Sequence, residues 1–340
     1  MTTINIPPQL ELQQLIQGFQ VTQGIYVAAK LGIADLLKDG PRTSEELARV
    51  TGTHAPSLYR VLRLLTAVDL LTEGQHHSFA LTPLGTYLRT GVPGSMRDTV
   101  LLYADQPVWQ VWGNLLHSVQ TGEPSFAHVF GLELFEYNQQ HPDHATLFNN
   151  MMTEWTVGVA PTVAEAYDFD AAGTLVDVGG GHGQMLASIL QAHPSLHGVL
   201  FDLPNVVKGA PALLERAGIA DRCQVIGGDF FTAVPTGYET YLLSRVIHDW
   251  DDERAMALLS RCHQAMKPQG TVLLVERVIV TGNAPQVLVL ESDVQMLVLS
   301  YGGRERTNAQ YGALLSAAGF EVTRLIPVLP PFYVIEAVRV

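Results

Sequence analysis

A histidine with two candidate carboxylates is the group of residues best suited to chemistry in this sequence. His248 opens the segment His-Asp-Trp-Asp-Asp after a predicted strand, and imidazole is well matched to accepting a proton near neutral pH. Glu276 follows an apolar run, and Glu305 lies within Gly-Gly-Arg-Glu-Arg-Thr. Carboxylates beside an imidazole fix its tautomer and stabilise its charged form. A lone histidine is more often structural, but a histidine with two such acids favours a general base.

The second stretch with chemical meaning is Thr174 to Gly183, Thr-Leu-Val-Asp-Val-Gly-Gly-Gly-His-Gly. It predicts a buried strand, a glycine turn and a helix, with glycines that let a ligand approach the backbone. A dinucleotide fingerprint would need a third glycine where Leu186 stands. The spacing instead resembles the first motif of class I methyltransferases that use S-adenosyl-L-methionine (AdoMet). A glycine turn without a ligand is the alternative.

Two further acids follow predicted strands. Asp202 comes after the glycine turn at about the distance from which an acid reaches a ribose in comparable folds. Asp229 could accept the amino group of an adenine while Phe230 stacks on the ring. Each acid could instead cap the next helix. Their joint occurrence after strands favours a nucleoside site.

The elements that must position these residues alternate from residue 170 onward, as in a mainly parallel, doubly wound α/β sheet. Ligands of such sheets bind beyond the carboxyl ends of the strands, so the glycines, Asp202, Asp229 and His248 should converge. The expected strands are 174–178, 199–201, 225–226 with its exit at 228–230, 241–247 and 271–275; the expected helices are 184–193, 210–217, 251–266, about 287–300 and 308–318; a hairpin of 320–328 and 332–340 follows.

The N-terminal part predicts helices and a winged helix-turn-helix. Residues 1–40 read as helix with an apolar face that either contacts another subunit or packs within the chain; this face carries Leu12, Leu15, Ile16 and Phe19. In residues 41–90, Thr43 and Glu46 form a capping-box pattern, and a hairpin follows the second helix. A transcription regulator is therefore the rival hypothesis. The second helix offers only Arg60 and Arg63 as cations, which disfavours a major-groove reader.

Composition limits the possible functions further. The chain has 340 residues, which suggests two domains, with 47% hydrophobic and 16% charged residues. A net charge of −13 disfavours nucleic-acid binding. Cys223 and Cys262 indicate neither a disulfide framework nor a metal site. No signal peptide or membrane span is recognisable, so a soluble cytoplasmic protein is expected. Residues 91–160 should be helical, with aromatic side chains that form either core or a pocket for a flat substrate.

Taken together, the motifs closely resemble those of the small-molecule O-methyltransferases of the caffeate and acetylserotonin type. The matching segments are Asp-Val-Gly-Gly-Gly-His-Gly, Phe-Asp-Leu-Pro, Gly-Gly-Asp-Phe-Phe, Ser-Arg-Val-Ile-His-Asp-Trp-Asp-Asp-Glu and Gly-Gly-Arg-Glu-Arg-Thr, in this order. The resemblance implies a class I methyltransferase fold, which is a Rossmann-like doubly wound sheet with an N-terminal all-α winged-helix dimerisation domain. It also implies a dimerisation and substrate-lid domain over 1–160 and an AdoMet-binding catalytic domain over 161–340.

The resemblance assigns roles to particular residues. His248 would be the base, flanked by Glu276 and Glu305. The implied AdoMet contacts are Asp177, Gly179, Gly180, Gly181, Asp202, Leu203, Gly228, Asp229, Phe230, Ser244, Arg245, Tyr137 and Trp155. The implied substrate-pocket residues are Phe148, Met152, Asp249, Met296 and Ser300. Many plant members carry lysine where Ser244 stands, so the contacts there differ.

The sequence therefore predicts a homodimeric, AdoMet-dependent O-methyltransferase that acts on a hydroxyl of a small aromatic molecule without a metal. Some members of the family have lost the base and no longer act as simple methyltransferases, so a repurposed hydroxylase or decarboxylase is the enzymatic alternative. The presence of His248, Glu276 and Glu305 argues against that alternative.

Overall fold

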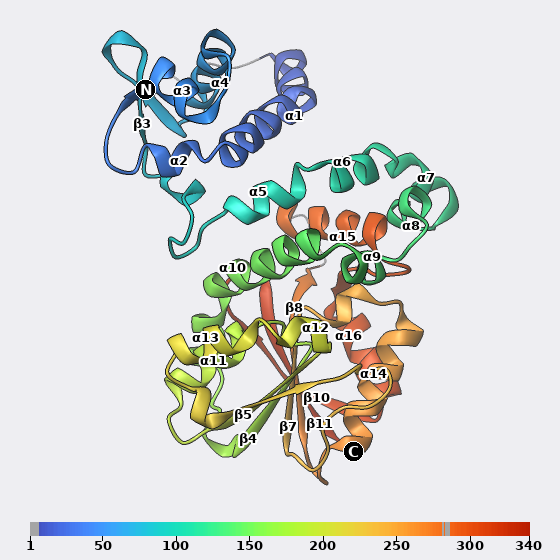
Figure 1. Cartoon of the computed structure of the whole chain (residues 1–340). Helices are drawn as coiled ribbons and strands as arrows, with labels where there is room; N and C mark the ends of the chain where they lie inside the picture. The colour runs from blue at the N-terminus through green and yellow to red at the C-terminus, as the bar shows by residue number, and fades with distance from the viewer. Residues whose placement is uncertain (1–6, 281, 283–285) are drawn as a thin grey trace. The chain divides into compact units, whose positions relative to one another are not determined.

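The computed structural model describes residues 7–280, 282 and 286–340. Contacts between residues divide the chain into two compact units, one ending at Trp109 and the other beginning at Gln110. Helix α6 (Gln106–Gly113) runs across this division. The contacts thus group residues 110–160 with the sheet that follows, whereas the sequence pattern suggested a boundary after residue 160 (Figure 1).

The first unit combines helices with a small antiparallel sheet in the order β1-β3-β2. Its elements are α1 (Pro8–Lys30), α2 (Ile33–Leu36), β1 (Arg42–Thr43), α3 (Ser44–Thr51), α4 (Ala55–Ala67), β2 (Leu71–Glu73), β3 (Ser78–Leu81) and α5 (Arg97–Tyr103). The predicted capping box is confirmed, because Thr43 Oγ1 accepts from the Glu46 amide and Glu46 Oε2 accepts from the Thr43 amide. Helix α3 ends at Gly52, whose φ of +67° suits glycine. The winged helix-turn-helix is therefore present.

The second unit contains the large sheet, which has eight strands among the described residues (Figure 1). Its strands are β4 (Thr174–Val178), β5 (His197–Asp202), β6 (Cys223–Gly227), β7 (Thr240–Ser244), β8 (Thr271–Ile279), β9 (Arg306–Thr307), β10 (Phe320–Pro327) and β11 (Phe332–Arg339). The strand order is β10-β11-β8-β7-β4-β5-β6, and β9 pairs with β8 outside this path. Strands β4 to β8 are parallel, and the C-terminal hairpin adds two antiparallel strands. The expected doubly wound sheet is confirmed.

The helices of this unit cover both faces of the sheet and one end of it. They are α7 (Leu115–Thr121), α8 (Ser125–Phe130), α9 (Leu134–Gln140), α10 (Pro142–Ala166), α11 (Gln184–Ala192), α12 (Pro204–Val207), α13 (Ala210–Arg216), α14 (Asp252–Ala265), α15 (Val287–Leu299) and α16 (Asn308–Ala317). Figure 1 shows α11 and α13 on one side of the sheet and α14 and α16 on the other. The alternation of side chains along each strand gives each helix layer its own apolar surface.

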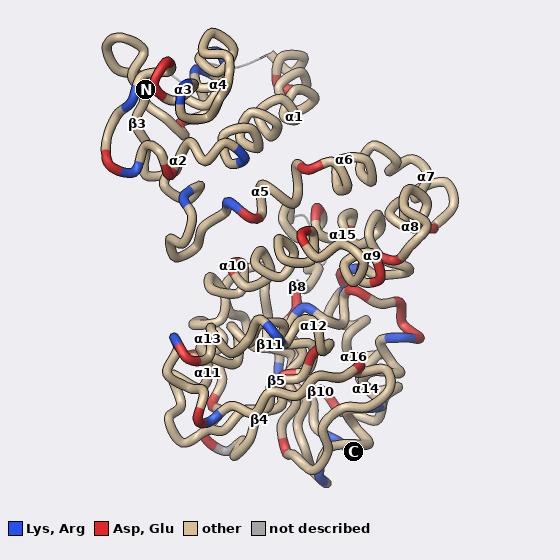
Figure 2. The backbone as a smooth tube through the Cα atoms, viewed as in Figure 1, with Lys and Arg blue, Asp and Glu red and all other residues tan. Residues whose placement is uncertain are grey.

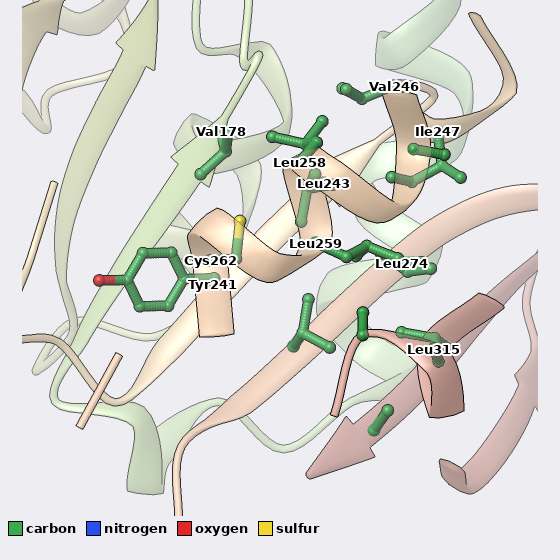
Figure 3. Close-up of a cluster of buried hydrophobic side chains, with 14 of the residues drawn as sticks. Val178, Tyr241, Leu243, Val246, Ile247, Leu258, Leu259, Cys262, Leu274 and Leu315 are labelled. Carbon is green, nitrogen blue, oxygen red and sulfur yellow. The ribbon is translucent and has the colours of Figure 1, made fainter. Parts of the chain in front are cut away.

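Successive residues of the central strands show this alternation. Leu242 packs in the cluster that includes Leu186 of α11, while the next residue, Leu243, packs with Leu258 of α14. Figure 3 shows the second cluster, in which Leu258 and Leu259 lie against the sheet near Leu243. Residues of both clusters are almost completely buried, so the strand ends that carry the polar residues rest on a rigid core.

Two predicted strand boundaries are wrong, and both bear on the site. The strand expected over 241–247 ends at Ser244, because Arg245 has a φ of +55° and interrupts it. His248 therefore lies in a short 3₁₀ turn (Ile247–Asp249) rather than at a strand end. The strand expected over 271–275 continues to Ile279, so that Glu276 is inside it and pairs with Tyr333 of β11.

Candidate active site

A cavity of about 210 Å³ lies at the carboxyl ends of β4, β5 and β7, within the second unit. Helices α9 and α10 complete its wall. The predicted site residues that line it are Asp177, Gly179, Gly180, Gly181, Asp202, Leu203, Asp229, Phe230, Ser244, Arg245, Phe148, Met152 and Asp249. The convergence expected at this edge of the sheet is thus present for these residues.

Other predicted site residues are not part of the cavity wall. They are His248, Glu276, Glu305, Gly228, Tyr137, Trp155, Met296 and Ser300. Ser300 borders a small neighbouring cavity that shares Asp249 and Trp250 with the first. The ring of Trp155 lies 5.9 Å from the Arg277 guanidinium, and Tyr137 stacks on His141 at 3.7 Å.

The glycine turn brings the backbone directly to the cavity. Gly179 and Gly181 have φ values of +72° and +60°, which other residues rarely adopt. A Cβ atom on Gly180 would lie 2.5 Å from Leu200 Cδ1 and 2.6 Å from the Asp177 carboxylate. The glycines are therefore required both by conformation and by space.

Gly180→Ala is expected to lower the free energy of unfolding by about 1–3 kcal/mol and to weaken AdoMet binding, since buried neighbours must shift. The matched control is Gly158→Ala in α10, where a Cβ atom meets nothing. Alanine there should stabilise the helix by about 0.5–1 kcal/mol. Denaturant unfolding and calorimetry with AdoMet measure both effects. Equal stability of the two variants would contradict the prediction.

Asp177 is an unusual buried acid at the cavity. Neither carboxylate oxygen has a hydrogen-bond partner in the described part of the chain. Burial, with repulsion from Asp202, raises the pKa of Asp177 to about 7. A cationic or hydrogen-bond-donating ligand group would relieve this unpaired carboxylate. The position therefore fits a ligand that carries an ammonium group.

Asp202 and Asp229 both accept backbone hydrogen bonds and both line the cavity. Asp202 accepts hydrogen bonds from the backbone N–H groups of Gly181 and Leu203 at 2.7 and 2.6 Å. Asp229 accepts from the Phe231 amide at 2.8 Å. Both acids thus organise their own turns while they also line the cavity. The side chain of Asp202 fixes the glycine turn itself.

His248 is held in a buried cluster of acids beside the cavity. Its Nδ1 lies 3.0 Å from Glu305 Oε1, and its Nε2 lies 3.6 Å from Asp249 Oδ1. Glu276 Oε1 accepts from the backbone N–H groups of Val246 and Ile247 at 3.1 and 2.9 Å. Glu276 therefore fixes the turn that carries His248, while Glu305 fixes the ring.

The charges and the burial of this cluster shift the pKa values of its members. Burial alone lowers the pKa of His248, but attraction to Glu305, Asp249 and Glu276 outweighs it and raises that pKa to about 9. Burial raises the pKa of Glu276 to about 7 and that of Asp249 to about 6, although the His248 charge opposes both shifts. For Glu305, burial is outweighed by His248 and its hydrogen bonds, so its pKa is lowered.

The same three residues have a spacing that could hold a metal ion, since donor atoms of His248, Glu276 and Glu305 lie within 4.8 Å of one another. Glu276 Oε1 and Glu305 Oε1 already accept hydrogen bonds, whereas the Oε2 atoms of both residues have no hydrogen-bond partner among the described residues. Glu305 Oε1 accepts from Ser292 Oγ at 2.6 Å and lies 3.5 Å from the Arg277 guanidinium, which supplies positive charge. These contacts favour a hydrogen-bonded proton-transfer cluster.

Arg245 and His182 connect the strand ends to α10, and His182 does so through Thr153; neither His182 nor Thr153 was predicted as a site residue from the sequence. Arg245 Nη2 donates to the carbonyl of Met152 at 3.1 Å and to Thr156 Oγ1 at 2.6 Å. His182 Nδ1 lies 3.3 Å from Thr153 Oγ1. His182 lies within the glycine motif, so the sequence could have indicated it as a site residue. No sequence pattern indicated Thr153 or Thr156.

A parallel sheet with a glycine turn after its first strand and acids at the ends of the next two defines the architecture of class I methyltransferases. Sequence profiles identify an O-methyltransferase domain over residues 112–321 and an O-methyltransferase dimerisation domain over residues 13–91. The chain belongs to this O-methyltransferase family, and it is an AdoMet-dependent methyltransferase.

Characterised relatives match along almost the whole chain. A phenazine O-methyltransferase of Lysobacter antibioticus is 42% identical over 98% of this chain and 96% of its own. The mitomycin biosynthesis 6-O-methyltransferase of Streptomyces lavendulae is 38% identical over 93% of this chain and 90% of its own.

Solved structures agree with this assignment. The crystal structure of LaPhzM superposes with a TM-score of 0.95 at 41% identity, covering 98% of this chain and all of that one. An O-methyltransferase of neocarzinostatin biosynthesis, solved with S-adenosylmethionine and 2-hydroxy-5-methyl naphthoic acid, superposes with a TM-score of 0.80 at 34% identity. That match covers 94% of this chain and 96% of the neighbour.

Acidic residues outnumber basic ones in this chain, and uncharged residues make up most of it. Asp and Glu number 33 against 20 Lys and Arg, and most of the tube in Figure 2 is tan. Among the described residues, no helix combines the length and apolar character that crossing a membrane requires. The winged helix-turn-helix lies within residues 13–91, which match the O-methyltransferase dimerisation domain.

Proposed function

We propose that this enzyme transfers the methyl group of AdoMet to a hydroxyl of a small aromatic metabolite, with His248 as the general base. The observation that carries the proposal is the buried His248–Glu305 pair, held beside a cavity with aromatic walls. The names of the relatives support the substrate class, since they act on phenazine and mitomycin compounds.

The cavity fits the cofactor that the family uses. The unpaired Asp177 carboxylate suits the ammonium group of AdoMet, and Gly179 to Gly181 leave room for a ligand against the backbone. Asp202 would bind the ribose, and Asp229 with Phe230 would bind the adenine; all three residues line the cavity, which supports these roles. AdoMet supplies a methyl group on a sulfonium, which is electrophilic without a metal.

In the reaction, His248 Nε2 would take the hydroxyl proton while the acceptor oxygen bonds to the methyl carbon and the carbon–sulfur bond of AdoMet breaks, which would leave S-adenosylhomocysteine. The Nδ1–H group donates to Glu305, which keeps Nε2 available and stabilises the imidazolium that forms. Asp249, 3.6 Å from Nε2, adds to this stabilisation. The walls of the cavity exclude water and hold the acceptor in line with the methyl group.

Nitrogen methylation is the second candidate. An 8-amino-8-demethylriboflavin N,N-dimethyltransferase of Streptomyces davaonensis is 38% identical to this chain. A neutral amine attacks with its own lone pair and needs no base at that step, whereas a weakly acidic hydroxyl does. The base cluster around His248 therefore favours oxygen as the acceptor atom.

The test uses methyl-labelled AdoMet with hydroxylated aromatics and the amino analogues of the same rings. We expect label on oxygen, with products assigned by mass spectrometry and NMR. Methylation of the amino compounds alone would favour the second candidate, and methyl transfer to neither set would reject the proposal.

We also propose a homodimer formed through the first unit. Leu12, Leu15, Ile16 and Phe19 of α1 are each more than half exposed, which is a large apolar surface for one helix. We expect light scattering to give a dimer mass, and Leu15→Glu to raise the dissociation constant at least about tenfold because it buries a charge. Gln14→Glu, on the same helix, should change little. A monomer mass for the wild type at micromolar concentration would contradict the proposal.

The pH dependence follows from the raised pKa of His248. A base must be neutral to accept a proton, so kcat/KM should rise with pH until about 9 and then level off. Asp249→Asn removes one negative neighbour of His248, so the rise of kcat/KM should occur at lower pH in this variant. The measurement requires an acceptor whose hydroxyl stays protonated over the whole range. If kcat/KM rises over the same pH range in the wild type and in Asp249→Asn, the assignment of His248 as the base is contradicted.

A further inference from the structure

The wall of the cavity formed by α9, α10 and the turn after β7 has the shape and chemistry of a site for a flat ring system. Phe135 stacks on Trp250 with ring centroids 5.7 Å apart and planes 27° apart, and it meets Phe148 edge-on at 6.2 Å. All three rings line the cavity, together with Met152. Aromatic walls bury a planar acceptor at a small cost in conformational entropy.

The polar side chains that α9 and α10 contribute to this wall are uncharged amides and hydroxyls. Asn138 and Asn149 both line the cavity, and Asn138 is 8% exposed. The Asn138 Oδ1 atom lies 2.6 Å from His144 Nδ1, which donates to it. The amide nitrogen of Asn138 is then the atom that can bind a ligand, because it can donate a hydrogen bond to a carbonyl oxygen or a ring nitrogen.

The charges around the cavity are unfavourable for an anion. Asp177, Asp202, Asp229 and Asp249 line it, while Arg245 is the single Arg or Lys among its described lining residues. Arg245 Nη2 already donates to Met152 and Thr156, and the carboxylate of AdoMet needs a cation as well. Burial lowers the pKa of His182, so this imidazole stays neutral near pH 7.

From this wall we propose that the enzyme selects uncharged planar acceptors that carry a hydroxyl and a hydrogen-bond acceptor, and that it rejects acceptors that carry a carboxylate. The inference rests on the proposed function, since it concerns the acceptor of the same reaction. A carboxylate in this cavity would lose water and face Asp249, and the cations that the described residues place in or beside it, Arg245 and the His248 imidazolium, already have partners.

The test compares a hydroxynaphthoic acid with its methyl ester, and a hydroxyphenazine carboxylic acid with its methyl ester. Each pair has the same ring and the same hydroxyl position and differs in charge. We expect kcat/KM for the ester to exceed that for the acid by at least about 30-fold at neutral pH. Fluorescence titration in the presence of S-adenosylhomocysteine should give the same order for binding.

A charge substitution on the wall provides the matched variant. Asn149→Arg adds a cation to the cavity and should shift the preference toward the acid by at least about tenfold. Asn149→Gln keeps a neutral amide and should retain the preference for the ester. An unchanged preference in Asn149→Arg would count against the proposal.

The outcomes separate this inference from the proposed function. O-methylation of acid and ester at rates within threefold overturns the selectivity and leaves the proposed function standing. Methylation only of amino analogues overturns the proposed function instead. If no compound is turned over, the fluorescence titration still decides. Tighter binding of the acid than of the ester would overturn the selectivity. If neither the acid nor the ester binds, the proposal of an aromatic acceptor is rejected.

Discussion

Replacing His248 with alanine is expected to lower kcat by about 10²–10⁴-fold, while the affinity for AdoMet stays nearly unchanged. The range is that of general-base catalysis, and His248 lies outside the cavity wall that would hold the cofactor. Kinetics with a weakly acidic phenol measures kcat, and calorimetry measures cofactor binding. His197→Ala, at the exposed start of β5, is the matched control and should leave both values unchanged.

The acidity of the acceptor separates loss of the base from general damage. A phenol that is already ionised at the assay pH needs no base, so His248→Ala should lose much less activity with it. Glu276→Gln should cost less than His248→Ala, because the amide oxygen can still accept from Val246 or Ile247. Full activity of His248→Ala on the weakly acidic phenol would reject the mechanism, even if AdoMet binding survived.

The sequence predicted the central strands and the glycine turn because local signals agree there. Thr174 to Val178 has three apolar residues with one acid among them and is bounded by glycine, and the helix that begins at Gln184 repeats leucine and isoleucine at helical spacing. The capping box at Thr43 was equally local. Each of these features needs only its own neighbours to form, so a single sequence contains the information.

The two strand boundaries that were predicted wrongly, those of β7 and β8, depend on residues far away in the sequence. A positive φ at Arg245 has no sequence signal, and in the structure this residue donates to Met152 and Thr156, about ninety positions away. The continuation of β8 past Glu276 was also not predicted, and Glu276 is accommodated inside the strand by two backbone donors from another segment. Tertiary contacts override local preference at both positions.

The side chains of α10 that line the cavity could be predicted only in part from the sequence. Phe148, Met152 and Thr156 recur every four residues and all line the cavity, so helical periodicity could have grouped them. Trp155 lies at the edge of this face and contacts Arg277 instead. Periodicity gives the relative directions of side chains, but which direction faces the cavity is set by packing.

Arg306 is a residue whose importance the sequence did not reveal. It follows Glu305, and its side chain is completely buried. Its Nη1 donates to the carbonyl of Ile247 at 3.1 Å and its Nη2 to that of Trp250 at 2.7 Å. The guanidinium therefore joins both ends of the turn that carries His248 to the segment that carries Glu305.

Arg306→Ala is expected to lower the free energy of unfolding by about 3–5 kcal/mol. The change leaves the Trp250 carbonyl without this donor and the Ile247 carbonyl with only the 3.3 Å bond from the Trp250 N–H group, and it opens a cavity in the core. The ion pair with Asp252 adds little to this value, because the Asp252 side chain is 54% exposed. Since the His248 turn loses its anchor, kcat should also fall in the fraction of enzyme that remains folded.

Arg304→Ala provides the matched control for this prediction. Arg304 pairs with the same Asp252, but its side chain is 44% exposed, so its loss should cost at most about 1 kcal/mol. Denaturant unfolding at one fixed protein concentration compares the two variants under equal conditions. If Arg306→Ala and Arg304→Ala unfold at the same midpoint, the buried carbonyl contacts contribute nothing measurable. A large difference would instead assign the stability to the contacts with Ile247 and Trp250, since both variants remove a partner of Asp252.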